Sequence, residues 1–182
     1  FTSLSIEADE VVNLGDIWAN NNAYLSSNKL ENSGNIIAVS TLNLDVETIK
    51  NSGLLRSDQE LFLTGSSFNN IGRVIAAKPL AICAKEGVCV EESSAEEDLG
   101  IANLNIDSIT NSGLLYSSGE VTINSNDITN LGNISGAKTA SLTADIISNY
   151  GMIEGGHDIV LLASSITNNE AANIQAFGKL TI

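Results

Sequence analysis

The side chains that could carry acid–base chemistry in this sequence are few and widely spaced. His157 is the only histidine, and the one carboxylate pair with a permissive spacing is Glu120 and Asp158, two repeats apart. A glycan hydrolase or lyase needs two carboxylates about 5–10 Å apart, or an acid beside a base such as His157 or Lys138. No Ser-His-Asp, Cys-His or metal-ligand cluster can be assembled, so we predict no catalytic residue, metal site, cofactor or enzyme activity.

Residues 79–100 hold the most unusual chemistry: the only Pro, both cysteines, and six acidic residues against Lys85 alone. Cys83 and Cys89 could close a small disulfide loop, worth about 2 kcal/mol in the chain-entropy model, and a secreted setting would permit it. The alternative is a solvated excursion with reduced thiols. The acidic side chains that we take as candidate receptor contacts are Glu91, Glu92, Glu96, Glu97 and Asp98.

Composition excludes several classes of partner. Eight Lys and Arg against 22 Asp and Glu give a net charge of −14, which repels phosphate backbones, so we predict no nucleic-acid binding. No apolar run approaches the roughly 18 residues of a membrane span, so we predict no membrane insertion. The chain is 43% hydrophobic and only 4% aromatic. We therefore expect a folded core of Leu, Ile, Val and Ala, too thin for large rings.

An internal repeat determines the secondary-structure elements that position the candidate residues. The tripeptide Asn-x-Gly recurs every 19 residues, apart from one interval of 41, and a degenerate last copy lacks the Gly. Apolar residues stand two and seven positions before each Asn and four positions after it. The repeated Asn residues are Asn13, Asn32, Asn51, Asn70, Asn111, Asn130, Asn149 and Asn168.

Each repeat predicts a strand before the Asn and a shorter strand after the Gly. Alternation such as Leu42-x-Leu44-x-Val46 has the period of a strand with one buried face, and Asn, Ser, Asp and Gly supply the turns. No unit of this kind buries its face alone. The sequence therefore predicts an all-β fold, a right-handed parallel β-helix solenoid of 19-residue coils with one loop insertion. The core motif of a leucine-rich repeat, the competing solenoid, does not recur.

The interval of 41 residues is one period plus 22, because no complete extra copy stands between Asn70 and Asn111. We expect coils over 1–78, an inserted acidic loop over 79–100, and further coils over 101–182. In the degenerate last copy Ala172 takes the apolar position four after the Asn. Leu180 then follows, without slip, as the first strand of a ninth copy.

The repeated polar columns have separate expected roles. The Asn side chains are expected to stack into a ladder, each amide bonding the neighbouring backbone and the next Asn. The Gly is expected where φ is positive. A further column, four before the Asn, contains acids such as Asp9 and Glu47. These lie too far apart to gather the six to eight oxygens of a calcium site, so we expect a solvated turn column.

Outward-facing aromatic residues are the remaining candidates for binding. Trp18 and Tyr116 fall in one column, five after the Asn, while Tyr24 and Phe62 share another. Exposed rings anchor protein and glycan partners, so Trp18 and Tyr116 are candidate receptor contacts. The alternative is that scattered exposed rings are ordinary surface residues.

The repeat form L-x-L-x-x-x-x-I-x-N-x-G-x-I-x-A, clearest over 42–76 and 104–155, resembles the arrays of filamentous-haemagglutinin-like exoproteins. That family includes two-partner secretion adhesins and the sticks of contact-dependent growth inhibition effectors. The resemblance implies export through an outer-membrane barrel, a secreted or bacterial cell-surface location, and a receptor on a target cell. The family's secretion and toxin domains are not recognisable in this chain.

We therefore expect a structural and adhesive repeat segment of a large fibrous exoprotein, which presents its loop and one face to a protein or glycan receptor. A purely structural spacer is the alternative, and a glycan-processing enzyme is less favoured. Because the chain starts at Phe1 and has no signal peptide, we expect it to be a piece of something larger.

Overall fold

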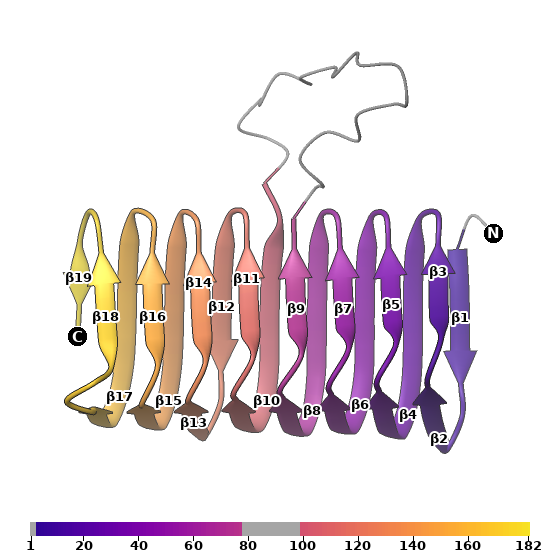
Figure 1. Ribbon diagram of the computed structural model, residues 1–182, viewed down its shortest axis with the longest axis horizontal. Helices are drawn as coiled ribbons and strands as arrows, with labels where there is room; N and C mark the ends of the chain where they lie inside the picture. Colours follow the sequence, from indigo (N-terminus) through magenta and orange to yellow (C-terminus); the bar gives the residue numbers. More distant parts are fainter. Residues whose placement is uncertain (1–2, 78–98) are drawn as a thin grey trace, which may run out of the picture.

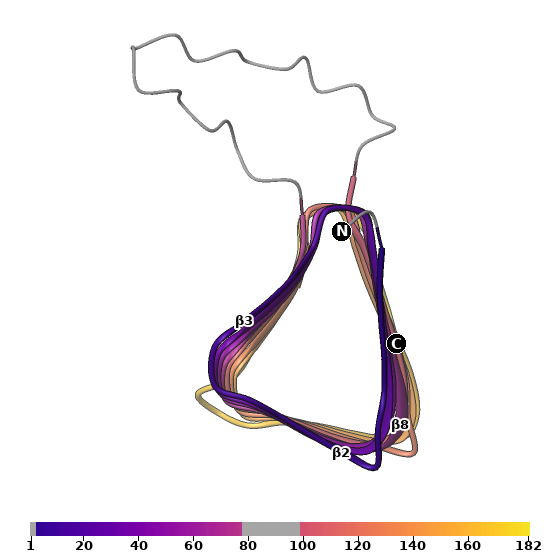
Figure 2. The same ribbon diagram turned by 90° about the vertical axis from the view of Figure 1, so that its right-hand side faces the viewer.

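The computed structural model describes residues 3–77 and 99–182, which form a stack of parallel strands without a helix (Figure 1). Each strand pairs with its counterpart one repeat away; Leu44, for example, aligns with Leu25 on one side and Leu63 on the other. Seen from the N-terminal end, the chain turns clockwise as it recedes (Figures 1 and 2). The predicted right-handed parallel β-helix is confirmed.

Each coil has three sides, which give the triangular cross-section of Figure 2. In the first coil the sides are separate strands: β1 (Ser3–Glu7) on the first side, β2 (Glu10–Asn13) on the second and β3 (Asp16–Ala19) on the third. In most later coils one strand of eleven residues, such as β6 (Thr41–Asn51), pairs along both the first and the second side. The repeat predicted the two strands, and the solvated turn column expected four residues before the Asn lies at the corner within the longer one.

The strands of the first and second sides form an 11-stranded sheet. Besides β1, β2 and β6 it contains β4 (Asn22–Asn32), β8 (Glu60–Asn70), β10 (Ile101–Asn111), β12 (Glu120–Asn124), β13 (Asp127–Asn130), β15 (Thr139–Asn149), β17 (Asp158–Asn168) and β19 (Leu180–Thr181). The third side is an 8-stranded sheet. Besides β3 it contains β5 (Asn35–Ala38), β7 (Leu54–Ser57), β9 (Arg73–Ala76), β11 (Leu114–Ser117), β14 (Asn133–Gly136), β16 (Met152–Gly155) and β18 (Asn173–Ala176).

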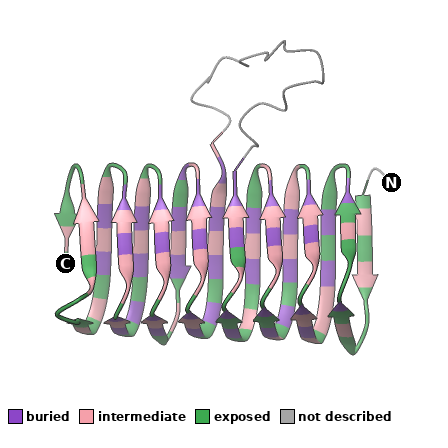
Figure 3. Cartoon of the chain, viewed as in Figure 1, coloured by how far each residue is buried: buried purple, intermediate pink, exposed green. Residues whose placement is uncertain are grey.

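The core is a continuous column of aliphatic side chains inside the triangle. Figure 3 shows the buried residues as bands that continue from coil to coil, and Leu42, Ile49 and Leu55 are fully buried within one coil. Each such side chain contributes about 1.5–3 kcal/mol through burial. One ring fits inside: Phe68, which stands in the apolar column two before the Asn, is buried, and its coil has only Gly65 where the next coil has the buried Ile106.

The coil stack continues directly across the insertion. Strand β8 pairs with β10 from Glu60–Ile101 to Asn70–Asn111, so no coil lies between them. The predicted boundary is wrong by one residue. Gly100 is buried in the coil wall, where its carbonyl accepts a bond from Ser117 Oγ. The insertion therefore lies between Ala77 and Gly100, as residues 78–99.

The last coil is two residues longer than the others, which corrects two expectations. Ile174, and not Ala172, aligns with Ile153, and Leu180 aligns with Ile159 instead of Leu161. The extra residues lie in the corner between β17 and β18, where the Gly of the repeat is missing. Because side chains alternate with period 2, a slip of two keeps the apolar residues on the inner face.

Candidate functional site

The repeated Asn side chains lie above one another at the corner between the second and third sides, and six of them are almost completely buried. From Asn13 to Asn149, each Nδ2 donates to Oδ1 of the next Asn toward the C-terminus, as Asn111 does to Asn130 at 2.9 Å, and also to a carbonyl of the next coil, Asn133 at 3.1 Å. The bond from Asn70 to Asn111, 2.8 Å long, crosses the insertion. These amides are engaged within the stack, so the ladder is structural.

The Gly column beside the ladder has a different physical cause from the one expected. None of the described glycines has φ in the left-handed region. Instead the corners stack so closely that a Cβ placed on Gly34 would overlap the carbonyl oxygen of Gly15, and one on Gly53 would overlap that of Gly34. Close backbone approach between coils, rather than backbone conformation, requires glycine here.

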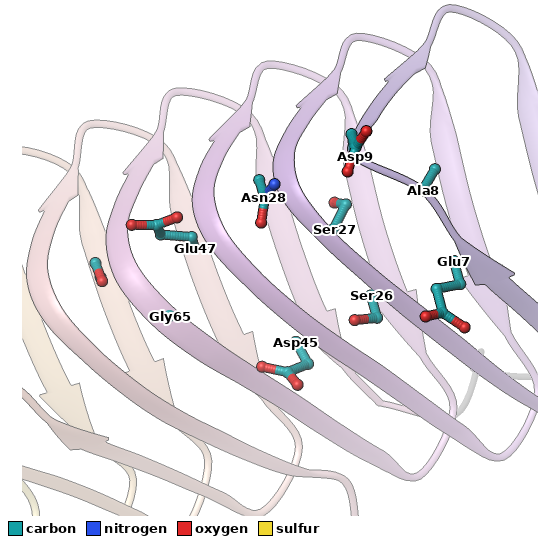
Figure 4. A pocket seen from close by; sticks show the side chains of 10 residues that line it. Glu7, Ala8, Asp9, Ser26, Ser27, Asn28, Asp45, Glu47 and Gly65 are labelled. Atoms are coloured by element: carbon teal, nitrogen blue, oxygen red, sulfur yellow. The ribbon is translucent and has the colours of Figure 1, made fainter.

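An open groove of about 820 Å³ runs along the opposite corner, between the first and second sides, over the first coils. Figure 4 shows its polar side chains in two rows along the rod: Asp9, Asn28 and Glu47 in one, and Glu7, Ser26 and Asp45 in the other. The second row was missed by the sequence analysis. Its signal was available, because Glu7, Ser26 and Asp45 each stand six residues before a ladder Asn.

The groove carries four carboxylates but does not gather them. Within each row, Ser or Asn separates the acids, so successive carboxylates lie two coils apart, about 10 Å. No Lys or Arg lines the groove, and the described residues contain no group of three or more His, Cys, Asp or Glu able to hold a metal ion. This corner is an acidic, solvent-open surface.

The residues considered for catalysis are held by the corner between the third and first sides. Glu120, Thr139 and Asp158 align on successive coils. Asp158 Oδ1 accepts the backbone N–H of Lys179 at 2.8 Å and lies 2.9 Å from His157 Nδ1. The Lys179 N–H holds the pKa of Asp158 below its usual value, with His157 acting in the same direction. This carboxylate stabilises the turn before β19.

The aromatic candidates are separated by the fold. Trp18 is 55% exposed, and its Nε1 donates to Asn20 Oδ1 at 2.8 Å. Tyr116 is half-buried on the same side, between Ile75 and Ser135. Four coil steps, about 19 Å, separate the two rings. They share a column but form no common pocket in the part of the chain that the structure describes.

Charged pairs on the rod surface were not predicted, although the period of 19 contains their signal. Lys29 Nζ lies 2.7 Å from Glu10 one coil away and 3.0 Å from Glu31 on its own strand. The Glu10 contact raises the pKa of Lys29, and the Lys29 contact lowers the pKa of Glu31. Arg56 Nη2 lies 2.8 Å from Asp58 Oδ1. The Lys29 pairs are exposed, so they add little stability.

The insertion candidates Cys83, Cys89, Glu91, Glu92, Glu96, Glu97 and Asp98 lie outside the described residues. Within the described ranges, no helix has the length and apolar character needed to cross a membrane. No protein-family model, curated protein or solved structure matches the chain.

Proposed function

We propose that this chain is a structural and adhesive rod segment of a large secreted or bacterial cell-surface fibrous protein, of the filamentous-haemagglutinin-like kind that its repeat resembles. The observation that supports this is the continuity of the rod through the insertion. Strands β8 and β10 keep full register and the Asn70–Asn111 bond keeps its length of 2.8 Å. A wall that accepts 22 extra residues without disturbance is suited to presenting a recognition segment.

In this proposal the acidic segment and an outward side of the rod contact a protein or glycan receptor on a target cell. Export proceeds through the outer-membrane barrel of a two-partner system, and neither nucleic acid nor membrane insertion is involved. The second candidate is a purely structural spacer. The Asn ladder favours it, because those amides bond within the stack and leave the corner without a binding role.

Removing the insertion separates the two candidates. Joining Ala77 to Gly100 places Asn111 19 positions after Asn70, which is the interval of the repeat, so the variant should fold as a regular rod. The measurement is binding of the labelled chain to bacterial and host cells. Loss of binding supports an adhesive insertion, and unchanged binding supports the spacer.

A second variant keeps the length of the insertion but removes its charge, by replacing Glu91, Glu92, Glu96 and Glu97 with Gln and Asp98 with Asn. If charge mediates recognition, this variant should bind as poorly as the deletion. Incubation with arrayed glycans, followed by analysis for released sugars, tests the remaining alternative. Binding without release fits an adhesin; release that disappears in Asp158→Asn would show an enzyme.

A further inference from the structure

The outer surface of the third side differs in composition from the rest of the rod. Two residues of each coil face outward there, the third and the fifth after the ladder Asn. They include Ile37, Leu54, Ile75, Leu114, Tyr116 and Met152, all partly exposed, and both arginines of the sequence, Arg56 and Arg73. No lysine occurs among them. Enrichment in aromatic residues, Met and Arg with depletion of Lys is typical of the core of a protein–protein interface.

The other two sides contain no outward Arg or Met, although Tyr24 and Phe62 face outward on the first side. On the second side the outward positions are mostly Thr, Ser and charged residues, and the exposed large apolar side chains are Val12 and Ile146. The third side also contains two buried polar atoms without a hydrogen-bond partner among the described residues, Arg56 Nε and Asn133 Oδ1. Buried polar groups are rarely left in this state.

We propose that two copies of this chain pack third side against third side, with their rods antiparallel and a two-fold axis running along β11. Under this rotation, a coil a given number of steps before β11 faces the partner's coil the same number of steps after β11. The third residue after a ladder Asn faces a third residue, and the fifth faces a fifth. Tyr116 and Leu114, both on β11, therefore meet their own counterparts in the partner. Leu54 faces the partner's Met152, so the apolar residues meet at the centre.

Charge complementarity selects this register. Arg56 and Glu154 belong to one column, and each lies two coils from Tyr116, on opposite sides of it. The two-fold axis therefore brings Arg56 of each copy opposite Glu154 of the other. Arg73 and Asn133 are likewise one coil on either side of Leu114, so the partner's Arg73 faces the Asn133 position, and the charge pair of this register is that of Arg56 with Glu154. Charge-assisted bonds of this kind are strengthened when water is excluded.

The alternative symmetric arrangement, with the two-fold axis along the rod, is disfavoured by the same residues. In that arrangement each coil faces the same coil of the partner, but the strand direction is reversed. The third residue after each ladder Asn would therefore lie opposite the partner's fifth. Arg56 would then face Leu54 and keep only Asp58 of its own chain, and Glu154 would face Met152, which leaves the Glu154 charge without a partner. A buried unpaired charge is strongly unfavourable.

The area of the surface sets the strength of the expected association. Eight strands of four residues, spaced about 4.8 Å apart, give a face of about 500 Å² in projection. This is below the about 800 Å² per partner of a standard interface. The dimer is therefore expected to dissociate on dilution, and its detection requires a concentration series.

Sedimentation velocity on the 182-residue chain, from low to high micromolar concentration, tests the proposal. The unmodified chain should pass from monomer to dimer. Arg56→Glu and Glu154→Arg should each raise the dissociation constant about tenfold or more through like-charge repulsion. The double variant Arg56→Glu/Glu154→Arg should recover the dimer, because it restores two opposite-charge pairs. Lys50→Glu, on the second side, is the matched control and should leave the dimer unchanged.

Several outcomes would overturn the proposal. The first is a chain that stays monomeric throughout the series, and the second is a double variant as dissociated as the single ones. A third is growth beyond dimers that responds equally to Arg56→Glu and Lys50→Glu, which would indicate association through the rod ends. Far-UV circular dichroism identical to that of the unmodified chain establishes that each variant is folded.

Discussion

At the scale of single residues, the ladder asparagines are the polar groups on which the stack depends most. Asn111 is fully buried, donates to Asn130 and Asn133, and accepts from Asn70. In Asn111→Ala the amide of Asn70 loses its shortest bond and keeps only the longer ones to the carbonyls of Gly72 and Leu114, and Asn130 Oδ1 loses its donor. Each buried group left without a partner costs about 1–3 kcal/mol, so we expect a loss of about 2–4 kcal/mol in the free energy of unfolding.

Urea unfolding followed by circular dichroism measures this loss. Asn69→Ala is the matched control, because Asn69 precedes a ladder residue but is exposed on the second side. It should change the free energy of unfolding by no more than about 0.5 kcal/mol. Equal effects of the two substitutions would contradict a structural role for the ladder.

The glycine column gives a second prediction within a single column. A Cβ on Gly53 would meet the carbonyl of Gly34, whereas a Cβ on Gly15, in the first coil, would have open space around it. Gly53→Ala is therefore expected to destabilise the rod by about 1–3 kcal/mol through overpacking. Gly15→Ala should be tolerated, since no positive φ is involved. Thermal melts of the two variants measure the difference; similar melting temperatures would refute the stacking explanation.

The turn before β19 should respond to acid. The Lys179 N–H lowers the pKa of Asp158, so the contact stabilises the folded chain above the unfolded pKa. That contribution is lost as the pH falls through the lowered folded pKa. An NMR titration of the Lys179 amide should show a midpoint below the usual aspartate range. In Asp158→Asn the amide shift should not titrate, and a normal midpoint in the unmodified chain would contradict the contact.

At the scale of elements, the repeat predicted the strands, their parallel pairing and their inward faces, because period-2 alternation and a constant interval of 19 determine all three. The corner within the long strands was only partly predictable. A turn was expected at the column four before the Asn, and Ser26 and Ser27 beside it in β4 are turn-forming residues, but the sequence does not show that the strand continues through the corner in most coils. The slip in the last coil was also hidden, since a shift of two leaves Leu180 on the inner face and preserves the apolar pattern.

The insertion provides the prediction at this scale. Deleting residues 78–99 restores a regular coil and removes the entropy of closing a 22-residue loop, an ideal-chain gain of about 2–3 kcal/mol. The variant should therefore unfold at a temperature equal to or above that of the full chain, by calorimetry. Deleting the whole coil 114–132 is the control: register is kept, but buried side chains are lost, so stability should fall.

The binding surfaces were less predictable than the strands, because they depend on how the three sides of a coil are arranged. A spacing of 19 residues identifies which residues stack in one column. The sequence therefore predicted that Asp9 shares a column with Glu47, and Trp18 with Tyr116. It does not show which side of the triangle a column occupies, and the groove arises where two columns meet at a corner. Glu7 and Asp45 became part of that surface only when the corner was known.

At the scale of the whole molecule, each coil contacts only its neighbours. The loss in free energy of unfolding that a substitution causes therefore depends on its place along the rod. Ile109 is fully buried in the middle, while Ile166 occupies the same column in the last complete coil and is only partly buried. Ile109→Ala should cost about 2–5 kcal/mol. Ile166→Ala should cost less than half as much in urea unfolding; equal costs would mean that the end coil is as well packed as the centre.

The direction of the backbone hydrogen bonds has a mechanical consequence. In this rod they run from coil to coil, along the long axis, so tension between the two ends loads them one layer after another. Under tension the chain should therefore unfold one coil at a time, in discrete steps of extension. Each released coil of 19 residues adds about 65 Å of contour length. The layer that holds the insertion releases 41 residues, about 140 Å, and is the long step in an otherwise even series.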